Sequence, residues 1–214
     1  GSESTIASVV SDDDTHEKFF VVDSRTIPLA VTLDPVLMLS VPPALTAATG
    51  MDALTHAIEA YIGTIATSET DKKALEAVLL IFENLPKAFA DGSDLAAREA
   101  MSLASYKAGQ AFTKASLGYV HAISHQLGAH YGLAHGLGNA IVLPYVLEFS
   151  KDAARHKLSK LALALKLGKP EDGETKLAEK MVDAVSKLNT QLDIPKKALD
   201  LKESDIESAY SKDT

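Results

Sequence analysis

The sequence predicts a mainly α-helical protein in which a multi-helix domain follows a few short β-strands. The chain has 214 residues, 46% of them hydrophobic, which is enough to bury a substantial core. Short runs of β-branched and aromatic residues, typical of strands, are confined to the part before Pro42. Long alanine-rich segments with apolar residues at helical spacing follow it. We therefore divide the chain into residues 1–42 and residues 43–214.

The first part contains three candidate strands, with the sequences IASVV, KFFVVD and AVTLD. They are separated by the acidic run Asp12-Asp13-Asp14, by Ser24-Arg25 and by Pro28, all of which favour turns. Two or three strands are expected from this pattern.

The second part is predicted to form seven helices, whose ends are marked by prolines, glycines and acidic residues. Pro86, for example, is expected to end the second helix, which begins near Glu69. Thr49 followed by Asp52 is similar to a capping box, with Thr49 as the N-cap of the first helix. The predicted helices span residues 51–61, 69–85, 94–114, 118–131, 136–149, 152–167 and 174–192.

Composition excludes several classes of protein. Asp and Glu outnumber Lys and Arg by 29 to 21, giving a formal net charge of -8, so neither nucleic acid nor a membrane surface is an expected partner. No apolar run is long enough to span a bilayer, and the N-terminal residues lack a signal-peptide pattern, which indicates a cytoplasmic protein. The absence of cysteine excludes thiolate ligands, so any metal ion would be bound by nitrogen and oxygen.

Four of the seven histidines lie within the stretch Gly118–Asn139. His121 and His125 are four residues apart, so they project from one face of a helix, while His130 lies off that face and is expected to have a structural or rim role. His135 follows a segment broken by glycine. No strand precedes the glycines of this segment, Gly132, Gly136 and Gly138. A turn that brings His135 toward the other histidines is therefore a better interpretation than a phosphate loop.

A second pair, Asp52 and His56, has the same four-residue spacing. If its helix packs against the helix of His121, these three side chains converge with one or both of His125 and His135. Such a set of nitrogen and oxygen donors suits Fe(II) or Zn(II). An isolated helical histidine is more often a packed or surface residue than a ligand, so the interpretation depends on all of these residues together.

A metal ion bound by these residues would polarise an oxygen atom and lower its pKa. That chemistry serves hydrolysis, alcohol oxidation and carbonyl reduction alike. No Glu occupies the base position of an HExxH-like motif, which disfavours a zinc hydrolase.

The segments TGMDALTHAIEAY and GYVHAISHQLGAHYGLAHGLGNAIVLPYV closely resemble the two signatures of the iron-containing (group III) alcohol dehydrogenase family. The resemblance includes the upstream KFFVVDSRTIPLAVTLDP and VPPALTAATG and extends to about Phe149, with weaker helical similarity beyond it. It implies a C-terminal metal-binding domain that holds a divalent metal, which is iron in most relatives and zinc in some.

The resemblance also implies roles for individual residues. His125 matches a histidine that lies beside the metal and the nicotinamide, where it could pass the hydroxyl proton outward or position the nicotinamide. Lys18 matches a lysine that contacts the coenzyme, NAD or NADP, although by itself it could be an ordinary strand-edge lysine. The metal would act as a Lewis acid while hydride leaves an alcohol for the coenzyme, or in reverse reduces an aldehyde. The family's metal ligands fall on Asp52, His56, His121 and His135.

The sequence departs from the family in one respect. Relatives have a Rossmann-like nucleotide-binding domain with a Gly-Gly-Gly-Ser loop, and neither that loop nor a GxGxxG element occurs here. The resemblance therefore implies a fragment, in which residues 1–42 are residual strands of an incomplete nucleotide-binding domain. Residues 43–214 would be the helical metal-binding domain, with an incomplete C-terminal end. We expect such a chain to bind a divalent metal but to show little turnover alone.

Two other functions are compatible with the sequence. A glycerol dehydrogenase type of enzyme shares the architecture but favours zinc and polyols, so metal content and a substrate panel would distinguish it. A helical remnant without enzymatic activity could instead serve as an oligomerisation or binding module. Apolar surface left where a missing domain packs would favour association, so we expect a homo-oligomer, such as a dimer.

Overall fold

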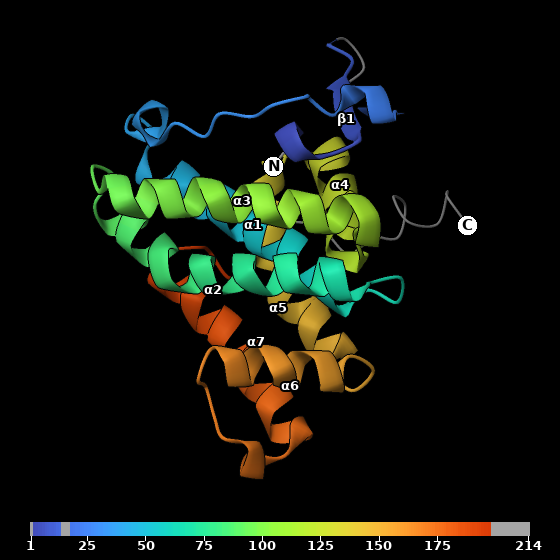
Figure 1. The fold of residues 1–214 in the computed structure, drawn as a ribbon, viewed down its shortest axis with the longest axis vertical. Helices are drawn as coiled ribbons and strands as arrows, with labels where there is room; N and C mark the ends of the chain where they lie inside the picture. Colours follow the sequence, from blue (N-terminus) through green and yellow to red (C-terminus); the bar gives the residue numbers. More distant parts are fainter. Residues whose placement is uncertain (1, 14–17, 198–214) are drawn as a thin grey trace.

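The computed structural model describes residues 2–13 and 18–197, and it is mainly α-helical, as the sequence predicts (Figure 1). Strands β1 (Ala7–Ser11) and β2 (Lys18–Val22) form an antiparallel hairpin. Short 3-10 helices occupy Ser2–Ser4, Ser24–Thr26, Pro35–Met38 and Pro170–Asp172. The α-helices of the described residues are α1 (Pro43–Ile62), α2 (Ser68–Ala90), α3 (Leu95–Ala115), α4 (Tyr119–Tyr131), α5 (His135–Ser150), α6 (Arg155–Ala164) and α7 (Glu174–Gln191).

Helix α1 lies at the centre of the helical part, packed against α2, α3 and α5 (Figure 1). Twelve of its 20 residues are buried, whereas a helix on the surface buries only one stripe. Small residues permit this close packing. A Cβ added to Gly50 would lie 2.3 Å from Leu85 Cδ1 of α2. Side chains on α1 are therefore held by neighbours on several sides.

Helix α1 begins at Pro43, earlier than the predicted start at Met51. Pro42 is extended and serves as the N-cap, and Pro43 occupies the first helical position, where no N–H is needed. Thr49 consequently lies inside the helix, where its Oγ1 donates to the carbonyl oxygen four residues earlier at 2.8 Å. The interpretation of Thr49 and Asp52 as a capping box is therefore wrong.

Three further predictions about secondary structure differ from the structure. Pro86 does not end α2, which continues to Ala90, because packing against α1 and α3 holds the helix together despite one missing N–H. The segment AVTLD, residues 30–34, forms no strand, and within the described residues the only sheet is the hairpin of β1 and β2. Helix α6 ends at Ala164, earlier than predicted, shortly before Lys166 adopts a positive φ of 58°.

Helix α5 contains Pro144, whose missing N–H leaves the carbonyl oxygen of Ala140 without its helical partner. Asn189 of α7 replaces that partner, because its Nδ2 donates to Ala140 O at 2.6 Å. The hydrogen bond is buried in the contact between α5 and α7. One side chain thus helps to fix how α7 lies on α5.

Replacing Asn189 with Leu is expected to destabilise the fold by about 1–3 kcal/mol, because a buried acceptor loses its hydrogen bond. The midpoint of urea unfolding, followed by far-ultraviolet circular dichroism, measures this loss. Gln191→Leu, at an exposed position of the same helix end, is the matched control and should change the midpoint little. Equal midpoints for wild type and the Asn189 variant would contradict this role of the contact.

Glycines set the path between α4 and α5. Gly132 has a φ of 65° and ends α4 in the left-handed conformation that favours glycine. A Cβ on Gly136 would lie 2.7 Å from Ala48 O, so α5 can approach α1 this closely only because the residue has no side chain. The turn and the close approach together bring His135, the first residue of α5, beside α1.

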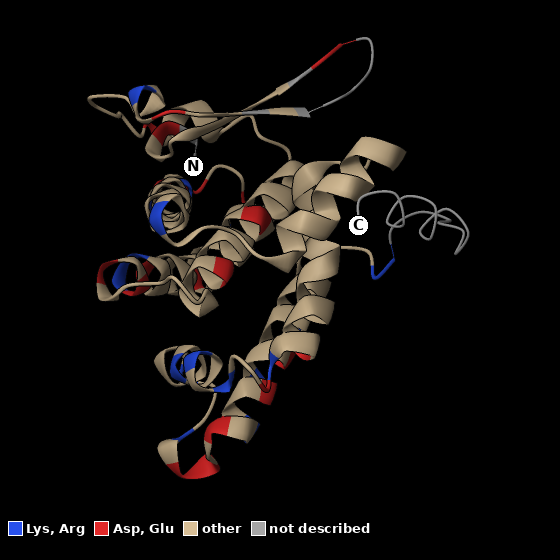
Figure 2. Ribbon diagram, turned by 90° about the vertical axis from the view of Figure 1, so that its right-hand side faces the viewer, with Lys and Arg blue, Asp and Glu red and all other residues tan. Residues whose placement is uncertain are grey.

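Helices α4 and α5 are the least charged of the fold. Asp, Glu, Lys and Arg are spread over α2, α3, α6 and α7, whereas α4 has none and α5 has only Glu148 (Figure 2). Despite this apolar character, no helix within residues 2–13 and 18–197 combines the length and hydropathy needed to cross a membrane.

Candidate metal site

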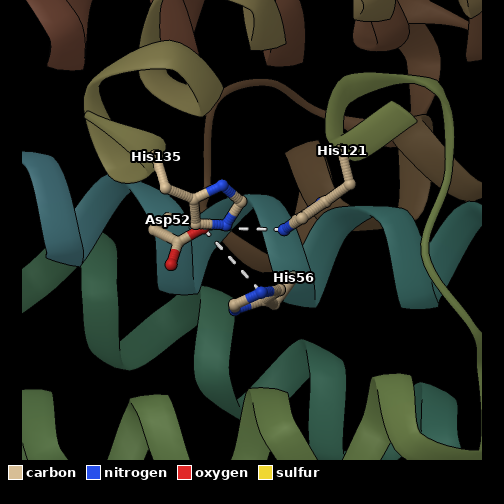
Figure 3. Close-up of side chains that lie close together, drawn as sticks. All are labelled: Asp52, His56, His121 and His135. Carbon is tan, nitrogen blue, oxygen red and sulfur yellow. Dashed lines mark ion pairs between the residues drawn. The ribbon is translucent and has the colours of Figure 1, made fainter. Parts of the chain in front are cut away.

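Four side chains that could bind one metal ion meet where α1, α4 and α5 come together (Figure 3). Asp52 and His56 lie one turn apart on α1. His121 comes from the first turn of α4, and His135 begins α5. One donor atom from each lies within 4.8 Å of the other three. Among the described residues, this is the only such group of three or more donors.

The spacing of the donors fits a shared ion better than direct hydrogen bonds. From Asp52 Oδ1, the three Nε2 atoms lie 3.4, 3.6 and 3.8 Å away, in the order His135, His121 and His56. These distances exceed those of good hydrogen bonds, yet four ligands at about 2.0–2.2 Å from a tetrahedral ion are separated by roughly 3.3–3.6 Å. Three imidazole nitrogens and one carboxylate oxygen also suit iron and zinc. The residues present therefore fit a divalent metal ion.

The cluster is closed on one side and open on another. The side chain of His121 is 3% exposed, and the ring of His56 is stacked between Phe112 and His121 at centroid distances of 4.5 and 4.6 Å. The side chain of His135, in contrast, is 35% exposed. A metal site of this kind can accept an external ligand from its open side, as sites in enzymes do.

Burial and charge shift the pKa values of the cluster. Burial alone would raise the pKa of Asp52, but the three histidines attract its carboxylate and hold the pKa well below the ordinary value. Burial lowers the pKa of His56 to about 3, against the attraction of Asp52. Burial also disfavours the charged form of His121, but interactions with Asp52 and Glu59 outweigh it and raise the pKa of His121 to about 9. Without a metal ion, the His121 imidazole is therefore in its positively charged form, with a hydrogen on both nitrogens, at neutral pH.

Glu59 contacts the cluster although it was not among the residues predicted to act there. Its Oε2 lies 2.6 Å from His121 Nδ1, and its side chain is 3% exposed. Because Asp52, His56 and Glu59 follow one another at helical intervals of four and three residues, they share one face of α1. That spacing is the signal in the sequence that could have identified Glu59.

Asn139 is a second buried residue that sequence patterns did not select. Its Nδ2 donates to Asp52 Oδ1 at 2.6 Å and lies 3.0 Å from His121 Nε2 and 3.2 Å from His135 Nε2. The amide nitrogen of Asn139 therefore lies close to three of the four donors. Its Oδ1 is buried and has no hydrogen-bond partner within the described part of the chain. The spacing of four residues from His135 places both on one face of α5.

The other residues predicted to act at the site lie outside the group of four donors. The ring of His125 lies beside the cluster, with its centroid 5.8 Å from that of His121 and 5.1 Å from that of His135. His130 is exposed near the end of α4. Lys18 begins β2, but its side chain lies outside the described part of the structure.

The helices meet in a different way from the one on which the predicted convergence depends. Convergence of these side chains was considered on the condition that the helix of His121 packs against the helix of Asp52; in the structure α5 makes the extensive contact with α1, and α4 packs on α5. His121 reaches α1 through the first turn of α4, where Glu59 accepts hydrogen bonds from the backbone N–H groups of Gly118 and Val120. A buried carboxylate thus connects two helices that otherwise have little contact.

Fold and site together define a helical domain with a candidate site for one divalent metal ion. Residues 46–212 match the model of the Fe-containing alcohol dehydrogenase family, C-terminal. Because this match covers most of the sequence, the chain belongs to the iron-containing alcohol dehydrogenase family. Its helical fold is thus the one that the resemblance implied.

Relatives of known name agree with the family. The chain is 45% identical over 209 residues to a 1,3-propanediol dehydrogenase of Klebsiella pneumoniae, covering 96% of this chain and 54% of that protein. It is 42% identical over 209 residues to an NAD-dependent methanol dehydrogenase of Bacillus methanolicus, covering 97% and 55%. The solved structure of an alcohol dehydrogenase from Oenococcus oeni superposes with a TM-score of 0.91 at 38% identity, covering 96% and 54%. The chain therefore spans about half the length of the curated relatives it matches.

Proposed function

We propose that residues 43–214 form the metal-binding domain of an alcohol dehydrogenase, which oxidises small alcohols to aldehydes or ketones with NAD(P)+ as the hydride acceptor. One observation supports this proposal most strongly. In a chain of this family, four nitrogen and oxygen donors from three helices lie at distances that suit one ion. Residues 1–42 are proposed to belong to a nucleotide-binding domain.

The four proposed ligands contribute in different ways to metal binding. Asp52 supplies the negative charge, and the histidines supply neutral nitrogen donors at distances of 3.4 to 3.8 Å from its Oδ1. A bound divalent ion supplies Lewis acidity toward the oxygen of an alcohol or an aldehyde. We propose iron as that ion, with zinc as the alternative. His121 is the most buried of the three imidazoles and His135 the most exposed, so the substrate is proposed to enter beside His135.

His125 and Lys18 are proposed to serve the proton and the coenzyme. His125 is half-buried beside His121 and His135, so it can pass a hydroxyl proton from the site outward or contact the nicotinamide. Lys18 begins strand β2 and is proposed to contact NAD or NADP. Neither residue belongs to the group of four donors.

The named relatives support the substrate class. One is a 1,3-propanediol dehydrogenase and another an NAD-dependent methanol dehydrogenase, so a small alcohol and a nicotinamide coenzyme are the corresponding proposals here. A glycerol dehydrogenase type of enzyme would contain zinc and prefer polyols. Metal analysis of the purified chain, together with a substrate panel on a longer form, distinguishes the two possibilities.

This chain alone is expected to bind about one divalent ion per molecule but to oxidise primary alcohols roughly 100-fold or more slowly than a full-length relative. The reason is that catalysis requires a coenzyme held in a fixed position, and the sequence lacks both the Gly-Gly-Gly-Ser loop and a GxGxxG element. Elemental analysis measures the metal, and NADH absorbance measures turnover of 1,3-propanediol by the chain loaded with Fe2+ without oxygen.

The Klebsiella pneumoniae relative, assayed in parallel, is the positive control, and the metal-free chain is the blank. Turnover at the rate of that relative would contradict the expectation of low activity. Failure to retain any Fe2+ or Zn2+ would contradict the metal site itself, and would favour a helical module that serves only binding or oligomerisation.

A further inference from the structure

We propose that Glu59 is a positioning residue of the metal site, which holds His121 in the tautomer and orientation that a metal ion requires. The proposal rests on the proposed function, because it concerns the same ion. It assigns a role to a residue that is not one of the four donors.

The contacts of the Glu59 carboxylate are all directed at the start of α4. Oε1 accepts a hydrogen bond from Val120 N at 2.7 Å, and Oε2 accepts one from Gly118 N at 2.9 Å. Oε2 also lies 2.6 Å from His121 Nδ1. The two backbone groups belong to the end of a helix that needs hydrogen-bond acceptors, so Glu59 fixes the backbone and the imidazole together.

The hydrogen bond to Glu59 decides which nitrogen of His121 is free. In the proposed arrangement Glu59 Oε2 accepts a hydrogen bond from Nδ1 of His121, so that Nδ1 carries a hydrogen. In the neutral ring, Nε2 then has the lone pair, and this atom lies 3.6 Å from Asp52 Oδ1, among the other donors. Loss of the carboxylate would allow the other tautomer, whose Nε2 cannot bind a metal.

Space and charge both agree with this role. A Cβ added to Gly118 would lie 2.9 Å from Glu59 Oε1, so a larger residue at this position would require the carboxylate to shift. Glu59 is nearly inaccessible to water, with a side chain 3% exposed. Together, Asp52 and Glu59 balance the charge of a divalent ion held by three neutral histidines, which reduces the cost of burying that ion.

Calorimetric titration with Zn2+ tests the proposal on wild type, Glu59→Gln and the control Glu83→Gln. Glutamine keeps the size of the side chain but replaces one acceptor oxygen by a donor group. We expect Glu59→Gln to bind Zn2+ about 10–100-fold more weakly than wild type. Glu83 lies on α2 with a side chain 70% exposed, so its variant should bind as wild type does.

Proton NMR separates a positioning role from a purely structural one. A hydrogen on His121 Nδ1 that is bonded to a buried carboxylate gives a strongly downfield resonance, which Glu59→Gln should remove. Gly118→Ala is a second variant that keeps the charge but displaces the carboxylate, and it should also weaken Zn2+ binding. If Glu59→Gln does not fold, the Zn2+ affinity of Gly118→Ala tests the proposal instead.

Three results would overturn the proposal: equal Zn2+ affinity in wild type and Glu59→Gln, weaker affinity with the downfield resonance retained, or, if only Gly118→Ala folds, unchanged affinity in that variant. A wild-type chain that binds no Zn2+ would instead refute the proposed function. In that case the resonance of the metal-free chain still decides whether Glu59 holds Nδ1 of His121.

Discussion

Asp52→Ala is expected to lower the affinity of the chain for Zn2+ by at least about 100-fold, because it removes the one anionic donor among the four. Loss of a residue that only orients a ligand already costs about 10–100-fold, and Asp52 supplies a donor atom itself. Its Oδ1 lies within 3.8 Å of each of the three Nε2 atoms, and Asp52 is the only carboxylate in the group of four donors.

Calorimetric titration and metal analysis of the purified variant measure this loss. Asp183→Ala, at an exposed position of α7, is the matched control and should bind Zn2+ as wild type does. Binding also appears as thermal protection, since an ion present at about 100 times its Kd stabilises the fold by about 2.7 kcal/mol. Unchanged metal content in Asp52→Ala would favour the hypothesis of a helical module without enzymatic activity.

The affinity for Zn2+ is expected to rise about tenfold per pH unit between about pH 7 and pH 9 and then to level off. The pKa of His121 is raised to about 9 in the metal-free chain, so an ion must displace a proton from Nε2 below that pH. Each pH unit below 9 therefore lowers the affinity for Zn2+ about tenfold. His56, with a pKa lowered to about 3, is already neutral and adds nothing to this slope.

Titration at about pH 7.5 in buffers of different ionisation enthalpy measures the proton directly, and about one proton should be released per ion. The metal-free chain provides the control. Because the folded pKa of His121 lies above its ordinary value of 6.5, this group stabilises the fold fully below about pH 6.5 and loses that contribution as the pH rises through about 9. An affinity independent of pH in this range would show that His121 is not protonated in the metal-free chain.

Much of the secondary structure can be predicted from the sequence, since each of the seven helices in the described residues overlaps a predicted helix. The differences occur where tertiary contacts outweigh local signals. Pro86 remains inside α2, and α1 extends back to Pro43, because both helices are held by packing. The segment AVTLD has the composition of a strand, but the sheet of the described residues contains only β1 and β2, and this segment does not pair with either of them.

The spacing of the histidines in the sequence also predicts only part of their arrangement at the site. It placed His121 and His125 on one face of a helix, and the structure does bring both rings near His135. Of these two, only His121 has a donor atom within 4.8 Å of donor atoms of Asp52, His56 and His135. The ligand roles themselves stay a prediction, which the metal titrations test.

The sequence by itself determined the chemistry that is available: nitrogen and oxygen donors without thiolates, with Asp52 and His56 on one face of any helix that contains them. Only the tertiary structure decided that these donors meet. Helical periodicity relates residues within one helix, whereas distances between helices depend on contacts such as that of Gly136 with α1. For the same reason, only the structure identified Glu59 and Asn139 as neighbours of the site.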